Sequence, residues 1–522
     1  MNSLIKTLEK LTLTLKNQFQ HIPSHPPKTL GRVFILALFT VFFASCTTVG
    51  PNYTPPKTQA DGHWHTKLQD GLREKLDGPK NEDETSESVN SDTFPKINEM
   101  QYLTTWWETL EDPLLIDLMS KAIDANLSLK QGMAALRQAS AQRGITNSRR
   151  YPTVDGDTSY YRKGSGSTSN GTGKESDIFA IGLDAGWELD LFGGIRRANE
   201  AADADLQASE AQLKDILVSI TAEVALNYLD VRVYQTRLDV AQANIISQKE
   251  TSELIQSRYQ AGLSDELAFK QAMYNLKSTQ SQLPTLRIGL EAAKNRLAVL
   301  VGQMPGALHG MLKAHDVIPS APILVAVGVP ADALRRRPDI RKAERELAAQ
   351  TARIGVAEAD LYPKFNLLGS IGLESLKAGD ILEWSSRVWR IGPGVSWKLF
   401  DAGSIRKNID VQTAIQEQFL LAYEQSVLFA LEEVENALTA FVEEQVRKDR
   451  LLEAVAAAQR AAELAQDQYT AGLIDFSNVL DAQRSLLSFE DALALSDGRV
   501  VANLVTLYKT LGGGWEAVHP AE

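Results

Sequence analysis

The chain has 522 residues, and its 54 basic and 66 acidic side chains give it a formal net charge of −12. Nucleic-acid binding requires a basic surface that neutralises phosphates, so this charge argues against a nucleic-acid partner. The single cysteine, Cys46, excludes a disulfide within the chain and a cysteine-based metal cluster. The length alone would suggest about three domains.

The N-terminal region has the pattern of a secretory signal. Residues 33–45 read VFILALFTVFFAS, an uncharged run that follows Lys28 and Arg32. A membrane-spanning helix needs roughly 20 apolar residues, so this run is too short to span and is typical of a signal-peptide core. We expect residues 1–45 to be a signal peptide with a long n-region.

Cys46 follows this run directly. The small residues Ala44 and Ser45 before it resemble a bacterial lipobox. We therefore expect Cys46 to carry a covalent lipid and expect no other cofactor and no metal. By analogy with bacterial lipoproteins, Thr47 in place of an aspartate favours delivery to the outer membrane. Residues 46–102 are polar and include the acidic run NEDETSESVNSD, which predicts a lipid-anchored flexible tether.

The rest of the chain is a tandem duplication. Trp187 and Trp397 stand 210 residues apart, and YQAGLSD from Tyr259 recurs as YTAGLID from Tyr469 at the same offset. Solenoid repeats are roughly 20 to 50 residues long, so this offset indicates two copies of one large unit. The expected divisions are a first repeat at 103–305, a linker or equatorial segment at 306–330, a second repeat at 331–515 and a tail at 516–522.

Each repeat contains a β-hairpin with alternating residues, expected at about 152–191 and about 363–400. This period of two is typical of a strand with one apolar and one polar face, as in membrane barrels. The apolar positions are Phe179, Ile181, Leu183, Ala185, Trp187, Leu189 and Leu191 in the first repeat, and Phe365, Leu367, Ile371, Leu373, Trp389, Ile391, Val395, Trp397 and Leu399 in the second.

Helices surround the hairpins. A first helix is predicted from Asp112-Pro113 to about Arg149. Helices of some 65 residues, roughly 100 Å long, are predicted at about 195–259 and about 405–469. Both end at Ala-Gly-Leu, where glycine suits the left-handed terminating conformation. A return helix follows each turn, and we expect the first to be interrupted near Pro284.

Two hairpins give four strands per chain. An open sheet edge in hydrocarbon leaves backbone groups unpaired at several kcal/mol each, so one chain cannot close a barrel. Small barrels start at about eight strands, and the pattern leaves eight, twelve or sixteen open.

The chain resembles TolC-type outer-membrane efflux factors, in the lipoprotein branch that serves resistance-nodulation-division (RND) pumps. The resemblance covers essentially everything from Cys46 to Trp515. It rests on the motifs VGPNY from Val49, Trp106-Trp107 before Asp112-Pro113, RRPDIR from Arg336, the two Tyr-Pro strand starts, the two Ala-Gly-Leu turns and LYKTLGGGW from Leu507.

The resemblance implies a mainly α fold with a membrane β part. A long coiled-coil α-helical barrel is continued by a β-barrel with four strands per chain, closed by trimerisation into twelve strands. It implies a passive outer-membrane channel of a tripartite efflux system, which exports small molecules and has a large periplasmic part. The implied partners are two sister copies, outer-membrane lipid, a periplasmic adaptor and an inner-membrane RND-type pump. The adaptor would dock at the turns of Gly262-Leu263 and Gly472-Leu473.

The resemblance also implies a periplasmic gate after the second turn. Asp481 matches the acid that forms a ring around the pore, Arg484 matches a basic partner, and Asp475 stands at the start of the same helix. Where some relatives carry a second acid this chain has Asn478, so the sequence leaves the number of acidic rings, one or two, undecided. The simpler alternative is that Asp481 and Arg484 form an exposed helical ion pair worth a few tenths of a kcal/mol.

Two other functional classes are alternatives to a channel. An enzyme is not expected, because none of the seven histidines stands in a recognisable catalytic motif. A non-channel structural coiled-coil envelope lipoprotein would explain the helices and Cys46. It gives no reason for two-faced strands that contain Trp187 and Trp397.

Overall fold

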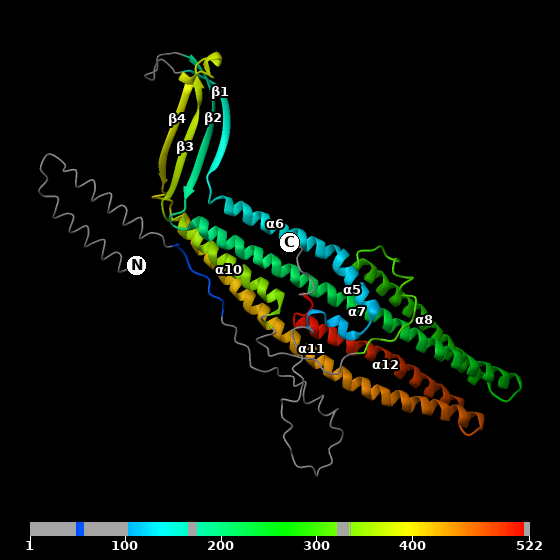
Figure 1. Ribbon diagram of the computed structural model, residues 1–522. Helices are drawn as coiled ribbons and strands as arrows, with labels where there is room; N and C mark the ends of the chain where they lie inside the picture. Colours follow the sequence, from blue (N-terminus) through cyan, green and yellow to red (C-terminus); the bar gives the residue numbers. More distant parts are fainter. Residues whose placement is uncertain (1–47, 57–102, 165–174, 321–333, 335, 516–522) are drawn as a thin grey trace, which may run out of the picture. The chain divides into compact units, whose positions relative to one another are not determined.

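The computed structural model describes residues 48–56, 103–164, 175–320, 334 and 336–515 (Figure 1). The chain divides into two compact units. The first combines Met1–Pro51, Ser148–Ala198 and Arg353–Asp410, and the second combines Asn52–Asn147, Asn199–Ala352 and Val411–Glu522.

The first unit contains a four-stranded antiparallel sheet in the order β1-β2-β3-β4. The strands are β1 (Thr153–Gly164), β2 (Glu175–Leu189), β3 (Lys364–Ser375) and β4 (Arg387–Ser396). Both expected hairpins are confirmed, and β2 pairs with β3, so the two repeats share one sheet.

The second hairpin is shorter than the prediction of about 363–400. Trp397 and Leu399 lie beyond the end of β4, because Ser396 already pairs with Lys364, the first residue of β3. Leu191 likewise lies beyond β2. The two repeat tryptophans still have equivalent roles, since Trp187 Nε1 donates to the Arg150 carbonyl at 3.0 Å and Trp397 Nε1 to the Leu361 carbonyl at 3.1 Å.

The register confirms that the sheet has two different faces. Residues directly opposite one another in antiparallel strands lie on the same face. The apolar positions of β2 stand opposite those of β3, and these stand opposite the apolar positions of β4. Ile371, Trp389 and Ile391 are 64%, 72% and 69% exposed, so the part of the chain that the structure describes leaves this face uncovered. Its members include Val154, Tyr160, Phe179, Ile181, Leu183, Ala185, Trp187, Phe365, Leu367, Ile371, Leu373, Trp389, Ile391 and Val395.

The long helices repeat with the same offset as the sequence motifs. The bounds of α11 (Ser404–Thr470) are those of α7 (Gly194–Gln260) displaced by 210 residues, and each helix has 67 residues. The bounds of α12 (Phe476–Thr510) relate in the same way to those of α8 (Glu266–Leu300). The other helices are η1 (Trp106–Leu110), α5 (Pro113–Ala125), α6 (Leu127–Ser148), α10 (Pro338–Ala359), η2 (Ala378–Asp380) and η3 (Trp384–Ser386).

The helix predicted from Asp112-Pro113 to about Arg149 is two helices. It begins as expected, because the Asp112 carboxylate accepts hydrogen bonds from the backbone N–H groups of Leu114 and Leu115. It breaks at Asn126, whose ψ of 129° is not helical. The Asn126 side chain accepts from the N–H of Ser128 and so caps α6, while its amide donates to the Leu300 carbonyl at 2.8 Å. This tertiary contact explains the break.

The predicted interruption near Pro284 is wrong, because α8 continues through this proline. Proline removes one helical hydrogen bond and crowds the preceding turn. Buried residues on both sides of it, Thr279 before and Leu286 after, hold the helix together by packing.

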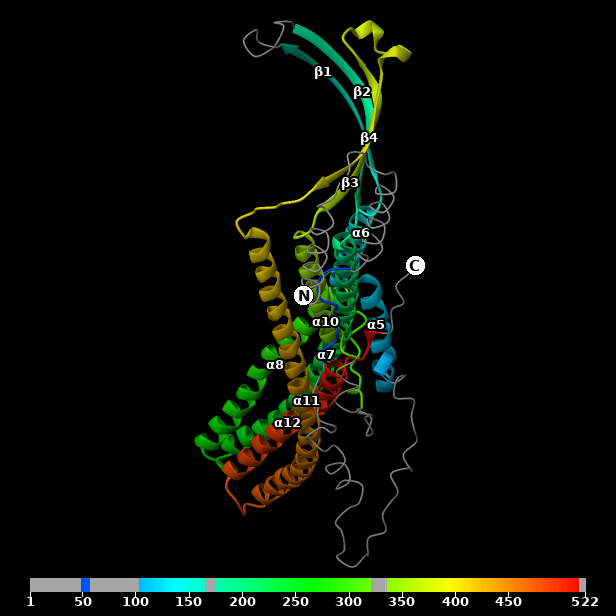
Figure 2. The ribbon, with the colours of Figure 1, turned by 90° about the vertical axis from the view of Figure 1, so that its left-hand side faces the viewer.

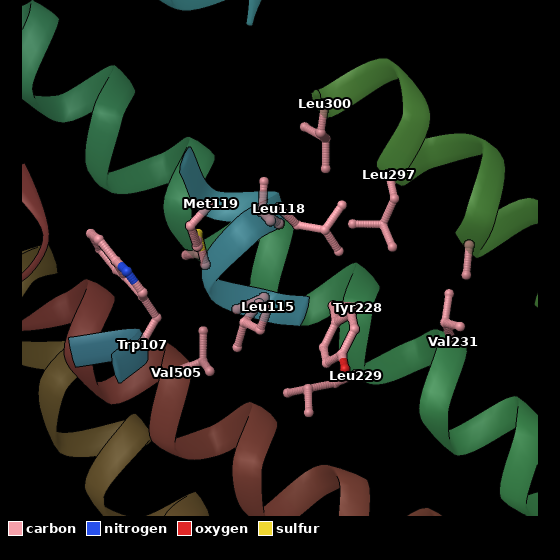
Figure 3. Close-up of a cluster of buried hydrophobic side chains, with 14 of the residues drawn as sticks. Trp107, Leu115, Leu118, Met119, Tyr228, Leu229, Val231, Leu297, Leu300 and Val505 are labelled. Carbon is pink, nitrogen blue, oxygen red and sulfur yellow. The ribbon is translucent and has the colours of Figure 1, made fainter. Parts of the chain in front are cut away.

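The main core of the second unit joins η1, α5, α7, α8 and α12 (Figure 3). Leu115 and Leu118 of α5 are fully buried, as is Tyr228 of α7. The Tyr228 hydroxyl bonds the Asp112 carboxylate and accepts from the buried guanidinium of Arg232 at 2.8 Å. Arg232 also donates to the Ala314 carbonyl at 2.9 Å, so a fully bonded polar group ties the segment after α8 to α7.

None of the helices formed by the described residues is both long and apolar enough to span a bilayer.

Close packing of α12 against α7 leaves no room for a side chain at Gly498. A Cβ added to Gly498 of α12 would lie 2.1 Å from Val233 Cγ2 of α7. We expect Gly498→Ala to lower the free energy of unfolding by about 1–3 kcal/mol through overpacking. The matched control is Gly144→Ala on the exposed surface of α6, where no atom lies within 4 Å. That change should raise stability by about 0.5–1 kcal/mol. Thermal denaturation followed by circular dichroism checks both, and equal shifts for the two variants would contradict the close packing.

Candidate functional site

The first predicted turn joins α7 to α8. Gly262 has a φ of +72°, the left-handed conformation that favours glycine. The Gly262 N–H bonds the Tyr259 carbonyl at 3.0 Å, and the Leu263 N–H bonds the Arg258 carbonyl at 2.8 Å. These two bonds are the Schellman pattern that satisfies the last carbonyls of a helix.

The second turn, between α11 and α12, repeats this geometry. Gly472 has a φ of +76°, and the Leu473 N–H bonds the Gln468 carbonyl at 2.9 Å. Leu263 and Leu473 are 70% and 74% exposed. Each turn therefore holds one leucine out into solvent on a well-defined backbone.

The tips of the two helical hairpins lie side by side in both views (Figures 1 and 2). An apolar cluster joins them just inside the turns. Phe476 of α12 packs against Tyr469 of α11, with ring centroids 5.3 Å apart. The buried members of this cluster are Ile255, Ala268, Ala272, Phe476, Val479 and Leu480.

Asp475 precedes α12 as its N-cap residue. Its counterpart in the first repeat, Asp265, accepts a hydrogen bond from the Ala268 N–H at 2.8 Å. The Asp475 side chain makes no such capping bond. The Asp475 carboxylate is therefore exposed and is not used to cap the start of α12.

Asp481 and Arg484 occupy the face of α12 away from the apolar cluster. The Asp481 side chain is 77% exposed, and its carboxylate lies 3.8 Å from Arg484 Nη1. Arg484 makes closer contacts with α8. Its Nε donates to Asn275 Oδ1 at 3.0 Å, and its Nη2 donates to the Tyr274 hydroxyl. Arg484 thus links the second hairpin to the first, while Asp481 remains open to solvent.

Sequence reasoning missed the contribution of Tyr274. The signal was available, because Tyr274 and Arg484 are separated by the repeat offset of 210 residues. The contact joins equivalent positions of α8 and α12. Residue type gave no indication, since an exposed tyrosine on a helix has many roles.

A layer of polar side chains lies next to the apolar cluster, on the side away from the two turns. Gln483 of α12 donates to Thr251 of α7 at 3.0 Å. Gln248 is only 3% exposed, yet neither atom of its amide has a hydrogen-bond partner among the described residues. The same holds for Asn275 Nδ2 and Gln483 Oε1. Each buried group left unpaired costs about 1–3 kcal/mol, so this interface is held less firmly than the main core.

Both described histidines pair with carboxylates, which the sequence did not indicate. His309 bonds Glu291, and His315 Nδ1 lies 2.9 Å from Asp239. Burial alone would raise the pKa of Glu291, but hydrogen bonds from His309 and Lys294 outweigh it and hold that pKa below its usual range. Among the described residues there is no group of three metal-binding side chains that could hold a metal ion.

Cys46 lies outside the described residues. The segment that follows it nearby is not free, however. The Val49 N–H bonds the Phe192 carbonyl at 3.1 Å, and Arg197 donates to the carbonyls of Val49 and Gly50. The expectation of a flexible tether therefore does not extend to these first residues.

Comparison with known proteins identifies the family. The family described as "Outer membrane efflux protein" matches residues 118–303 and 329–513. The chain belongs to this family. The solved outer-membrane channel OprN is 35% identical, with a TM-score of 0.80 over 90% of this chain and 100% of that one.

Two curated relatives agree with this assignment. Nodulation protein T of Rhizobium leguminosarum bv. trifolii is 31% identical over 499 residues, which is 92% of this chain and 97% of the relative. The solvent efflux pump outer membrane protein SrpC of Pseudomonas putida is 33% identical over 414 residues, 78% of this chain and 87% of the relative.

This outer membrane efflux protein is accordingly an outer-membrane channel component of an efflux system, with a periplasmic portion. Its family fold combines an α-helical barrel with a β domain, to which each chain contributes four strands. Channels of this family work with adaptors and inner-membrane pumps.

Proposed function

We propose that three copies of this chain form a passive duct whose twelve strands close one β-barrel. The sheet order supports this, since β1 and β4 each have a single neighbour among the described strands. In hydrocarbon every unpaired backbone group costs several kcal/mol, and pairing β4 of one copy with β1 of the next removes both edges. The exposed apolar face of the sheet is the surface that lipid would cover.

The lipid-facing role of the apolar face can be tested on adjacent residues. Ile391 and Gly392 lie next to each other in β4 on opposite faces, and an added Cβ at Gly392 meets no atom within 4 Å. We expect Ile391→Lys to reduce the yield of detergent-extracted trimer strongly, since lysine on the lipid face costs about 2–4 kcal/mol. Gly392→Lys should assemble normally. Light scattering of the purified protein measures both, and a monomeric wild type would refute the duct and favour a structural coiled-coil lipoprotein.

The channel is also a passive exit, to which other proteins deliver the substrate. We infer that the chain has no catalytic activity and that an inner-membrane RND-type pump provides the energy. The pump-associated relatives carry the names solvent efflux pump outer membrane protein and cation efflux system protein. A lipid on Cys46 would anchor the channel, and the contacts of Val49 and Gly50 with Arg197 would hold that anchor near the start of α7.

We also propose that the periplasmic adaptor docks on the two turns. Leu263 and Leu473 offer matching exposed apolar contacts on rigid backbones, which suits them as anchors in an interface.

Leu263→Asp combined with Leu473→Asp should abolish dye efflux from cells while leaving the bilayer conductance of the purified protein unchanged. Losing two such anchors is expected to weaken adaptor binding by roughly tenfold or more. Met304→Asp is the matched control, because Met304 is 83% exposed in the loop after α8. Normal efflux by the double variant would exclude the turns from docking.

We propose that Asp481, Arg484 and Asp475 form the periplasmic gate. Arg484 restrains α12 against Tyr274 and Asn275 of α8, and the poorly satisfied polar layer above lets the two hairpins separate. Three copies of the exposed Asp481 facing one axis would repel each other and attract cations.

Asp481→Ala with Arg484→Ala should raise the single-channel conductance in planar bilayers, because both the charge ring and the restraint on α8 are removed. Tyr274→Phe should give a smaller increase. The control is Arg450→Ala with Glu453→Ala, which removes an exposed ion pair of the same spacing on α11. If the gate pair and the control pair behave alike, Asp481 and Arg484 are only a surface ion pair.

A further inference from the structure

A row of charged residues crosses the polar face of the sheet. Asp155 of β1 stands opposite Asp184 of β2, Asp184 stands opposite Ser370 of β3, and Ser370 stands opposite Arg390 of β4. Directly opposed residues in an antiparallel sheet share a face, with Cβ atoms about 4.5–5.5 Å apart. The four strands therefore place one side chain each at a single level of the sheet.

The charges in this row interact with one another. The Asp184 carboxyl shares a hydrogen bond with Asp157, two residue pairs along β1 from Asp155, and it lies within electrostatic range of Asp155 and Arg390. Asp157 lies on the same face as Asp155, since only Gly156 stands between them along the strand. Each chain thus contributes two acids and one arginine at this level and a third acid, Asp157, beside it on the same face.

The residues next to the row on the polar face leave its charged side chains exposed. Much of the polar face near the row is glycine, including Gly182, Gly186, Gly372 and Gly392. The other cations of this face, Lys163 and Lys364, lie at opposite ends of the sheet, as the last-but-one residue of β1 and the first residue of β3. Leu368 and Val388 flank the row on this face, and the carboxylates and the guanidinium are the charged groups that project from this part of it.

We propose that this row is an ion-selectivity filter inside the β-barrel, separate from the gate at the helix tips. The proposal rests on the proposed trimer, in which three rows join into a closed belt that lines the lumen with net negative charge. Rings of acidic side chains select cations, and low-dielectric walls focus their field on the pore. The belt passes cations and cationic organic solutes in preference to anions, with Arg390 limiting the excess of negative charge.

The test measures reversal potentials of the purified protein in planar bilayers across a KCl gradient. Asp155→Asn with Asp184→Asn should lower the potassium-to-chloride permeability ratio by at least about twofold, because two charges per chain are lost from the belt. Arg390→Gln should raise the ratio. Opposite shifts in channels that both conduct cannot arise from misfolding.

The matched control is Asp177→Asn. Asp177 lies in the same strand as Asp184 but on the other face, where it accepts a hydrogen bond from the Tyr160 hydroxyl at 3.1 Å. Its permeability ratio should equal that of the wild type. An unchanged ratio in both belt variants would overturn the filter and leave selectivity to the helix tips. A wild-type protein that forms no channel would instead overturn the barrel itself, so the two failures are distinguishable.

Discussion

Unpaired backbone at the two edges of the sheet is the constraint on which the rest of this structure depends. Four antiparallel strands with one apolar face satisfy their internal hydrogen bonds, but β1 and β4 each retain an open edge within the described chain. Water can satisfy such an edge and hydrocarbon cannot. An exposed apolar face of this size is unfavourable in water and favourable in lipid. In lipid the two edges of the sheet can be satisfied only by partner strands.

The tandem duplication provides the four strands of this sheet, two from each repeat. Each repeat delivers one hairpin and one long helical hairpin, and the helix bounds coincide after a shift of 210 residues. Equivalent positions of the two repeats can be in contact and carry different residue types. Tyr274 and Arg484 are equivalent by position, yet one is an acceptor and the other a donor in their contact. Divergence of the two copies therefore created an interaction that identical copies would lack.

The second unit combines firmly and weakly packed regions. Its main core is apolar, with a buried arginine, Arg232, whose hydrogen bonds are satisfied by Tyr228, Gln235 and a backbone carbonyl. Nearer the tips, the interface contains Gln248 and Asn275 with buried amide atoms that no described residue satisfies. Apolar burial fixes the first region, whereas unmet hydrogen bonds make the second easier to separate.

The sequence by itself determined the elements with strong local patterns. Period-two alternation located the strands, and the left-handed conformation required at Gly262 and Gly472 located the turns. The N-cap chemistry of Asp112 located the start of α5. These features depend on residues that are close together in the sequence, so the sequence alone suffices to predict them.

Tertiary structure alone decided where local rules gave way. Asn126 breaks a helix because its amide reaches the Leu300 carbonyl, and α8 tolerates Pro284 because it is packed on both sides. β4 ends at Ser396 because its partner strand begins opposite it. The row from Asp155 to Arg390 also exists only through the register of three strand pairs. Residues far apart in sequence decide each of these outcomes, so no local pattern carries them.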